Sequence, residues 1–203
     1  MLNMDFFDRQ IRLFGIETQE KLKNTTIIID GTANNIASEI TKCVILLGVK
    51  EIKTTQEIVN KTEYLIKNKL KDINEHVKIT ILPSNILEKE VNTNLLSFKT
   101  ILTLLKLNKI KKTFNFSFII DKKIANGNNF YYICSNCLTF IKNTYKHDNC
   151  ANLRFNFQQE YNSKCLLMAK EVLLGAMSVQ EFIKIIEGKN GNNGIDQFTV
   201  KHI

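Results

Sequence analysis

The feature that most constrains the fold is a strand, a glycine, a helix and a second strand near the start of the chain. The β-branched run Thr26–Asp30 has the composition of a buried strand and ends at Gly31. Apolar residues then recur at helical spacing over Asn35–Leu47, Gly48 ends that helix, and a short strand is predicted at Glu51–Thr54. A strand, a crossover helix and a second strand form a parallel βαβ unit. We therefore expect an α/β fold with a Rossmann-like, doubly wound sheet and flanking helices.

The rest of the chain continues this alternation without an internal repeat or a linker, so residues 1–203 are predicted to form one domain. The run Ile101–Leu105 is apolar throughout, which is typical of a central strand buried on both faces. We expect further helices at about 6–15, 61–74, 116–124 and 162–188, and further strands at 77–82, 101–105, 130–134, 138–145 and 195–200.

The composition is that of a globular, intracellular protein. Apolar residues make up 44% of the 203 residues, which is enough for a full hydrophobic core. The acidic start, Met1–Asp5, has no apolar stretch behind it, and no window approaches the roughly 20 apolar residues of a membrane span, so neither a secretory signal nor a membrane anchor is expected. Five cysteines, an odd number, argue against a disulfide framework.

The net charge of +8 does not by itself indicate a nucleic-acid partner. The lysines are scattered singly among Asn, Glu and Asp, and no long run of like charge is present. Such a pattern is typical of a solvated, lysine-rich surface. We therefore expect no nucleic acid among the partners.

The first strand–helix turn lacks the glycines that nucleotide binding requires. The turn is Gly31-Thr32-Ala33-Asn34-Asn35-Ile36, so only the first glycine of a G-x-G-x-x-G pattern is present. Ala33 replaces the glycine that lets a phosphate approach the backbone, and Ile36 replaces the one that lets helix and strand pack closely. No acidic residue for a ribose hydroxyl follows the second strand, where Thr54-Thr55-Gln56 stands. The pattern predicts that this chain binds no nucleotide cofactor of its own.

Two of the three arginines lie in one short segment at the start of the chain. Arg9 and Arg12 fall within Phe7–Gly15, whereas Arg154 stands alone. An arginine kept in a lysine-rich chain can serve where a planar, bidentate and permanently charged group is needed. Phe7, Ile11 and Phe14 form an apolar helical stripe, and Arg9 lies ~200° around the helix from Phe7. Arg9 should therefore point away from the domain.

The segment Asp8–Gly15, Asp-Arg-Gln-Ile-Arg-Leu-Phe-Gly, precedes Thr18–Leu22 and the first strand. This order resembles the start of the ubiquitin-like modifier-activating enzymes, which have a ThiF/MoeB-type adenylation fold. The resemblance is greatest to the small, non-catalytic subunits of heterodimeric SUMO-activating enzymes. It is most specific over residues 5–53 and 162–200.

The resemblance implies a division of labour between two chains. The partner would be the larger catalytic subunit, which binds ATP and Mg²⁺, carries the thioester-forming cysteine and recognises a SUMO-like modifier. This chain would be an inactive adenylation domain with a nuclear or cytoplasmic location. Arg9 would be its one catalytic contribution, an arginine finger that reaches in trans toward the partner's ATP. Arg12 would instead hold the helix in place or pair with an acid of the partner.

The chain also departs from that family. The usual small subunit is longer, and the segment between Thr55 and Tyr64 is too short for the family's usual crossover loop. A large apolar face would be expected against the partner. We expect Leu167, Val179 and Phe182, on the helix at 162–188, to contribute to it.

The cysteines allow two interpretations. Cys134, Cys137, His147 and Cys150 form a C-x₂-C…H-x₂-C pattern of residue types that zinc favours. The first pair falls at the end of a predicted buried strand, and the second lacks the usual spacing, so buried thiols are the favoured interpretation. Cys165 is in register with Ala169 and Val172, which places it in the core, and no cysteine is expected to act as a nucleophile.

Three alternative functions remain open. The corresponding subunit of the neddylation-activating enzyme shares the opening motif but normally carries a large extra region. A homodimeric adenylating enzyme of the sulfur-carrier type would need an intact glycine turn. A zinc-ribbon nucleic-acid-binding protein would use the cysteine cluster and the positive charge.

Overall fold

The computed structural model describes residues 4–82, 114–122, 129–143, 164–188 and 197–200. Within these ranges seven strands form one sheet in the order β3-β2-β1-β4-β5-β6-β7. The strands from β3 to β5 pair in parallel, whereas β6 and β7 are antiparallel additions at one edge. The strands are β1 (Thr25–Gly31), β2 (Glu51–Thr54), β3 (Lys78–Ile81), β4 (Phe114–Ile120), β5 (Phe130–Cys134), β6 (Thr139–Lys142) and β7 (Gln197–Thr199).

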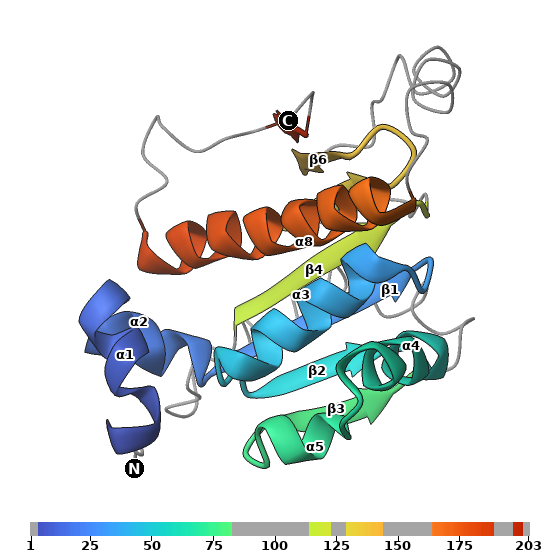
Figure 1. Ribbon diagram of the computed structural model, residues 1–203. Coiled ribbons are helices and arrows are strands. Elements are labelled where there is room, and N and C mark those ends of the chain that lie inside the picture. The colour runs from blue at the N-terminus through green and yellow to red at the C-terminus, as the bar shows by residue number, and fades with distance from the viewer. Residues whose placement is uncertain (1–3, 83–113, 123–128, 144–163, 189–196, 201–203) are drawn as a thin grey trace, which may run out of the picture.

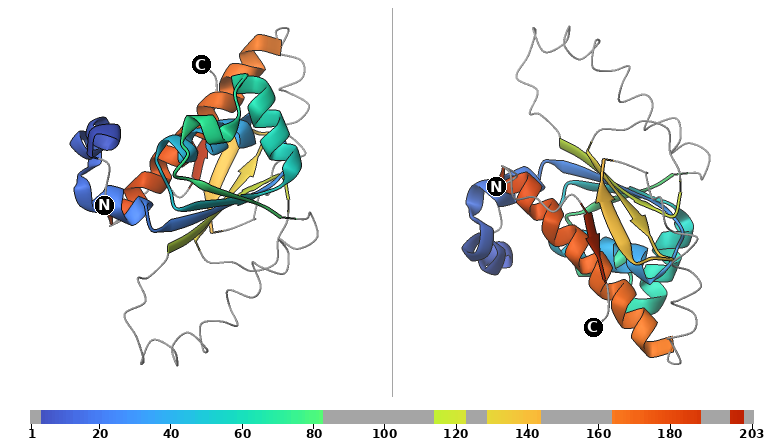
Figure 2. Two further views of the ribbon diagram at one scale, coloured as in Figure 1. Left: turned by 90° about the horizontal axis from the view of Figure 1, so that it is seen from below. Right: turned by 90° about the horizontal axis from the view of Figure 1, so that it is seen from above.

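Two helices, α3 and α8, lie side by side against the sheet (Figures 1 and 2). Helix α4 packs on the other side of α3, and α1 and α2 lie at the end of the domain where α3 and α8 both terminate (Figure 1). The helices are α1 (Met4–Phe14), α2 (Ile16–Leu22), α3 (Asn35–Leu46), α4 (Gln56–Ile66), α5 (Leu70–Ile73) and α8 (Lys164–Glu187). None of the described helices is long and apolar enough to cross a membrane.

The core between the sheet and α8 is rich in aromatic rings. The Phe182 ring of α8 lies with its centroid 5.0 Å from that of Phe116 and 5.8 Å from that of Phe118. Tyr131 of β5 closes the cluster, 5.3 Å from Phe116. All four side chains are at most 1% exposed. Edge-to-face and tilted rings at such distances add to the stability that burial itself provides.

Helices α3 and α8 approach closely at Gly175. A Cβ built on Gly175 would lie 3.0 Å from the carbonyl oxygen of Ile36 and 3.0 Å from Cβ of Glu39. Such contacts are too tight for a larger residue without local movement. The close approach brings the part of α8 that precedes Gly175 to the first turn of α3.

The predicted fold class is confirmed, but the helix predicted at 116–124 is wrong. Residues 116–120, expected to begin a helix at 116–124, belong to strand β4 beside β1. Phe116, Phe118 and Ile120 are alternate residues and lie on one face of the strand. Ile119, on the opposite face, is also buried, at 1% exposure. A strand buried on both faces satisfies this pattern better than a helix. The strand predicted at 101–105 lies outside the described residues.

The single helix predicted at 61–74 is also wrong, because the structure has α4 and α5 there. Helix α4 begins earlier than expected, where the Thr55 side chain caps it by accepting a hydrogen bond from the Ile58 amide at 3.4 Å. It ends at Lys67, whose left-handed backbone (φ 56°) interrupts the helix. The remaining predicted helices and strands are present in the described residues with small shifts at their ends.

The expected partner-facing surface on α8 needs a correction. Val179 and Phe182, predicted at an interface, are 3% and 0% exposed and belong to the domain's own core. Leu167 is 38% exposed and lies among the exposed apolar residues of the first turns of α8, with Leu166, Met168 and Val172. Phe182 and Val179 were assigned wrongly because the inner face of the helix is wider than a single stripe.

Phe182→Ala should therefore lower the free energy of unfolding of this chain by about 3–5 kcal/mol, because it leaves a cavity in the aromatic cluster. Leu13→Ala, at a side chain that is 80% exposed, should change it by less than about 0.5 kcal/mol. Urea denaturation followed by circular dichroism measures both. Equal effects of the two substitutions would contradict the assignment of Phe182 to the core.

Candidate functional site: the N-terminal helix and the closed turn

Helix α1 contacts the domain through the aromatic ring of Phe7 and the side-chain amide of Gln10. The Phe7 side chain is 2% exposed and occupies the space over Gly48, where a Cβ would lie 2.4 Å from the ring atom Cζ. Gln10 Nε2 donates to the carbonyl oxygen of Leu46 at 2.8 Å. Both contacts are to the end of α3, so α1 has a defined position on the domain.

Helix α2 extends the same connection. The side chain of Gln19 is buried, and its Nε2 donates to the carbonyl oxygen of Leu47 at 2.8 Å. Lys21 Nζ donates to the carbonyl oxygen of Ile186 at 3.2 Å, near the end of α8. The last carbonyls of a helix have no partner within the helix, so side chains that donate to them stabilise it. The N-terminal segment thus caps the ends of both α3 and α8.

The two arginines of α1 have different surroundings. Arg12 Nε lies 3.0 Å from Oδ2 of Asp8, one turn earlier on the same helix, and both side chains are largely exposed. Arg9 is exposed, as its helical position predicted, and no hydrogen bond or ion pair joins it to the described part of the chain. An arginine on a fixed helix with no internal partner is available to an external anion. Arg154 lies outside the described residues.

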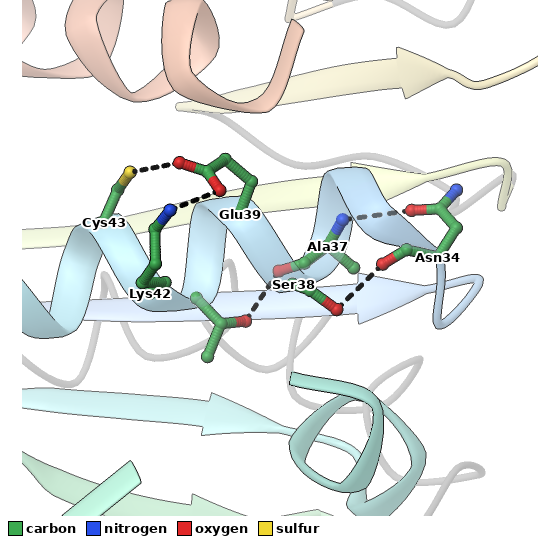
Figure 3. Close-up of polar contacts among 7 residues, drawn as sticks. Asn34, Ala37, Ser38, Glu39, Lys42 and Cys43 are labelled. Carbon is green, nitrogen blue, oxygen red and sulfur yellow. Dashed lines mark hydrogen bonds and ion pairs between the residues drawn. The ribbon is translucent and has the colours of Figure 1, made fainter. Parts of the chain in front are cut away.

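At the other end of α3, the chain itself occupies the amides of the turn after β1. The Gly31 amide donates to Oδ1 of Asp30 at 2.7 Å, and the Thr32 amide donates to the carbonyl oxygen of Ile120 at 3.1 Å. Asn34 caps α3, and its Oδ1 accepts from the Ala37 amide at 3.0 Å (Figure 3). In a phosphate-binding turn, amides at the helix N-terminus, such as that of Ala37, are left for the ligand.

The first glycine of the turn is explained by packing rather than by a ligand. Gly31 has φ 114°, and a Cβ there would lie 1.8 Å from the carbonyl oxygen of Ile120. Ile36 is fully buried in the core and Ala33 packs against it. The geometry supports the prediction of a turn closed to nucleotide, which remains a prediction until binding is measured.

The purified chain should bind neither ATP–Mg²⁺ nor NAD with micromolar affinity, because its own side chains and carbonyls occupy the amides of the turn. Isothermal titration calorimetry of the isolated chain measures this directly. Heat that saturates at micromolar ligand would overturn the expectation.

Polar residues that the sequence did not single out gather at the carboxyl ends of β1 and β4. Asp30, 2% exposed, pairs through Oδ2 with Lys122 Nζ at 3.0 Å. Asp121 has left-handed backbone (φ 57°) and accepts from the amide and the hydroxyl of Ser135, at 2.7 and 2.6 Å. The sequence could have indicated this cluster, because an acidic residue stands at the carboxyl end of each of the two strands. Ligands bind at this edge of the sheet in doubly wound folds.

Two of the four candidate zinc ligands lie in the described part of the chain. Cys134 and Cys137 are 2% and 0% exposed, and Cys137 Sγ donates to the carbonyl oxygen of Cys134 at 3.9 Å. His147 and Cys150 lie outside the described residues, so zinc binding is untested. Within the described part of the chain, no group of three or more His, Cys, Asp or Glu is placed to hold a metal ion. The side chain of Cys165 also lies outside the described residues.

Cys43, on α3, is a poor nucleophile. Burial and the Glu39 carboxylate, whose Oε1 accepts from Sγ at 3.3 Å, raise the pKa of the thiol to about 12 (Figure 3). On the order of one Cys43 thiol in ten thousand is then ionised at pH 8.

Iodoacetamide at pH 8 should therefore leave Cys43 unmodified in the folded chain, as peptide mass spectrometry would report. Glu39→Gln removes a negative charge beside the thiol and should speed alkylation roughly tenfold for each pKa unit that is recovered. Alkylation of Cys43 at the rate of an exposed thiol in the unchanged chain would contradict this account.

Comparison with known proteins agrees with this architecture. No protein-family profile matches the chain. A SUMO-activating enzyme subunit, aos-1, of Caenorhabditis elegans is 28% identical over 121 residues, which cover 48% of this chain and 35% of the relative. The chain thus spans about a third of that relative's length.

Solved structures show the same fold. Escherichia coli MccB, in a structure with MccA, superposes with a TM-score of 0.57 at 13% identity, over 100% of this chain and 70% of MccB. The E. coli tRNA N6-threonylcarbamoyladenosine dehydratase TcdA superposes with a TM-score of 0.53 at 10% identity, over 92% of this chain and 95% of TcdA.

The fold is therefore the Rossmann-like fold of MccB and TcdA. Its first strand–helix turn lacks two of the three glycines of the G-x-G-x-x-G pattern. In sequence the chain resembles a SUMO-activating enzyme subunit, as the opening motif predicted.

Proposed function

We propose that this chain is the non-catalytic subunit of a heterodimeric SUMO-activating enzyme. A larger subunit would bind ATP and Mg²⁺, adenylate the C-terminus of a SUMO-like modifier and transfer it to its own cysteine. This chain would stabilise that subunit and contribute Arg9 to the reaction. A complex that activates a nuclear modifier would work in the nucleus, the cytoplasm or both.

The observation that carries the proposal is the contrast between the two ends of α3. At its beginning, the turn that would bind nucleotide is filled by the chain's own groups, Asp30 and Asn34 among them. At its end, the contacts of Phe7 and Gln10 hold a helix that presents an exposed arginine. The domain has a closed turn, and its exposed Arg9 lies on a helix that is packed against the end of α3. This combination suits a supporting subunit better than an independent enzyme.

The proposed chemistry would benefit from a cation near the leaving pyrophosphate. Adenylation moves negative charge onto the pyrophosphate that leaves, and a fixed guanidinium stabilises charge that develops in the transition state. A fixed position matters, because a hydrogen-bond donor that must first be ordered stabilises the transition state much less. Arg9 has no described internal partner to give up, whereas Arg12 would have to leave Asp8.

Arg9→Ala in the reconstituted pair should lower modifier-dependent exchange of pyrophosphate into ATP by about 10²–10³-fold. Arg9→Lys should recover only part of the rate, because an ammonium is a point charge and cannot form the bidentate fork. Assembly of the pair, measured by size-exclusion chromatography, should be unchanged, since one exposed charge seldom decides a large interface.

Arg12→Ala is the matched control on the same helix. Its removal breaks only an exposed pair with Asp8, which contributes less than about 1 kcal/mol, so exchange should stay close to the unchanged rate. Wild-type exchange by Arg9→Ala would show that the motif is merely structural. Exchange with a NEDD8-like modifier but not with a SUMO-like one would assign the chain to the neddylation enzyme instead.

A further inference from the structure

The carboxylate of Glu171 lies at the beginning of α3. Glu171 is on α8, one turn before Gly175, at which α8 contacts Ile36 and Glu39 of α3. Its Oε2 accepts a hydrogen bond from Nδ2 of Asn35, the first residue of α3, at 2.5 Å. The close packing at Gly175 thus brings a negative charge to the positive end of the α3 dipole.

This location is the one at which a Rossmann-like fold holds a phosphate. The first helix after β1 directs its amide end toward the ligand, and the phosphate lies against it. Here a carboxylate from another helix is next to that end. A helix N-terminus favours an anion, whether it belongs to a ligand or to the chain.

The cations nearby are matched in the same way. Lys61 of α4 acts electrostatically on Glu171 and lowers its pKa, while Asp121, just after β4, acts in the opposite direction. Lys122, beyond the end of β4, is paired with Asp30 at 3.0 Å. Lys122 is thus paired with a carboxylate of the chain, and the charge of Lys61 acts on a second one, as each would act on a phosphate group in a nucleotide site.

The charge at Glu171 is not retained for stability. Burial raises the pKa of its carboxyl above the ordinary value, in spite of the hydrogen bond from Asn35 and the charge of Lys61. A raised pKa means that folding disfavours the ionised form, so the anion costs stability at neutral pH. The half-buried charge is therefore not explained by stability alone.

We propose that Glu171 is an internal anion that takes the place of a phosphate at the N-terminus of α3. It neutralises Lys61, and together with the Asp30–Lys122 pair it keeps the site closed to external anions. The role concerns this chain's own turn and does not depend on the partner, the modifier or Arg9.

Glu171→Gln tests the proposal because it removes the charge and preserves the size of the side chain. Inorganic pyrophosphate is the probe, and the thermal midpoint Tm of the purified full chain is measured at constant ionic strength and pH 7.5. The Tm of the unchanged chain should not move. The Tm of Glu171→Gln should rise by about 3–6 °C at 10 mM pyrophosphate, which corresponds to a Kd of about 1 mM.

Two controls make the result specific. Glu39→Gln removes a carboxylate from the middle of α3, where it pairs with Lys42, and should not confer a response. Adding Lys61→Gln to Glu171→Gln should abolish the gain. If Glu171→Gln does not fold, Glu171→Asp, which withdraws the charge by one methylene, should show a smaller rise. A Tm that responds to pyrophosphate no more than that of the unchanged chain would refute the proposal.

Discussion

The carbonyl groups at the end of α3 organise the part of the molecule that distinguishes it. The oxygens of Ile45, Leu46 and Leu47 accept hydrogen bonds from the side-chain amides of Asn74, Gln10 and Gln19, at 3.1, 2.8 and 2.8 Å. An unsatisfied carbonyl costs about 1–3 kcal/mol where it is buried, as at Ile45 and Leu47, and less at Leu46, which is 45% exposed. The need to satisfy them joins three separate segments at one point. The position of the arginine-bearing helix follows from that need.

Both ends of α3 are therefore completed by side chains of this chain. One end is closed by neutral amides that donate, and the other by Asn34, which accepts, with the Glu171 carboxylate beside Asn35. In a nucleotide-binding relative of this fold class, a ligand would complete the amide end. Here side chains of the chain itself form hydrogen bonds at both ends of the helix.

Much of this could be predicted from the sequence because it depends on local pattern. The βαβ unit and its turn follow from periodicity and one glycine, and the outward position of Arg9 follows from its angle around the helix. Strand β4 could have been predicted too, since Phe114-Asn115-Phe116-Ser117-Phe118 alternates with a period of two. The helical spacing of Phe116, Ile119 and Ile120 concealed it.

The contacts between distant segments could not be predicted. Nothing in the local sequence of Gln10 indicates a carbonyl at Leu46, and nothing around Glu171 indicates Asn35. Such pairs depend on the distance between packed helices, and Gly175 sets that distance through the absence of a side chain. Val179 and Phe182 were misplaced for the same reason, because the width of a buried face depends on what packs against it.

The contact between Phe7 and Gly48 limits which substitutions the two positions can accept during evolution. The aromatic ring fills the volume that any side chain at position 48 would need, so neither residue can change freely while the other stays. A larger residue at position 48 would displace α1 and carry Arg9 away with it, although the arginine itself would be untouched. Related chains that keep the arginine should therefore keep a small residue at position 48. In chains that have lost both, helix α1 would no longer hold an arginine in this position.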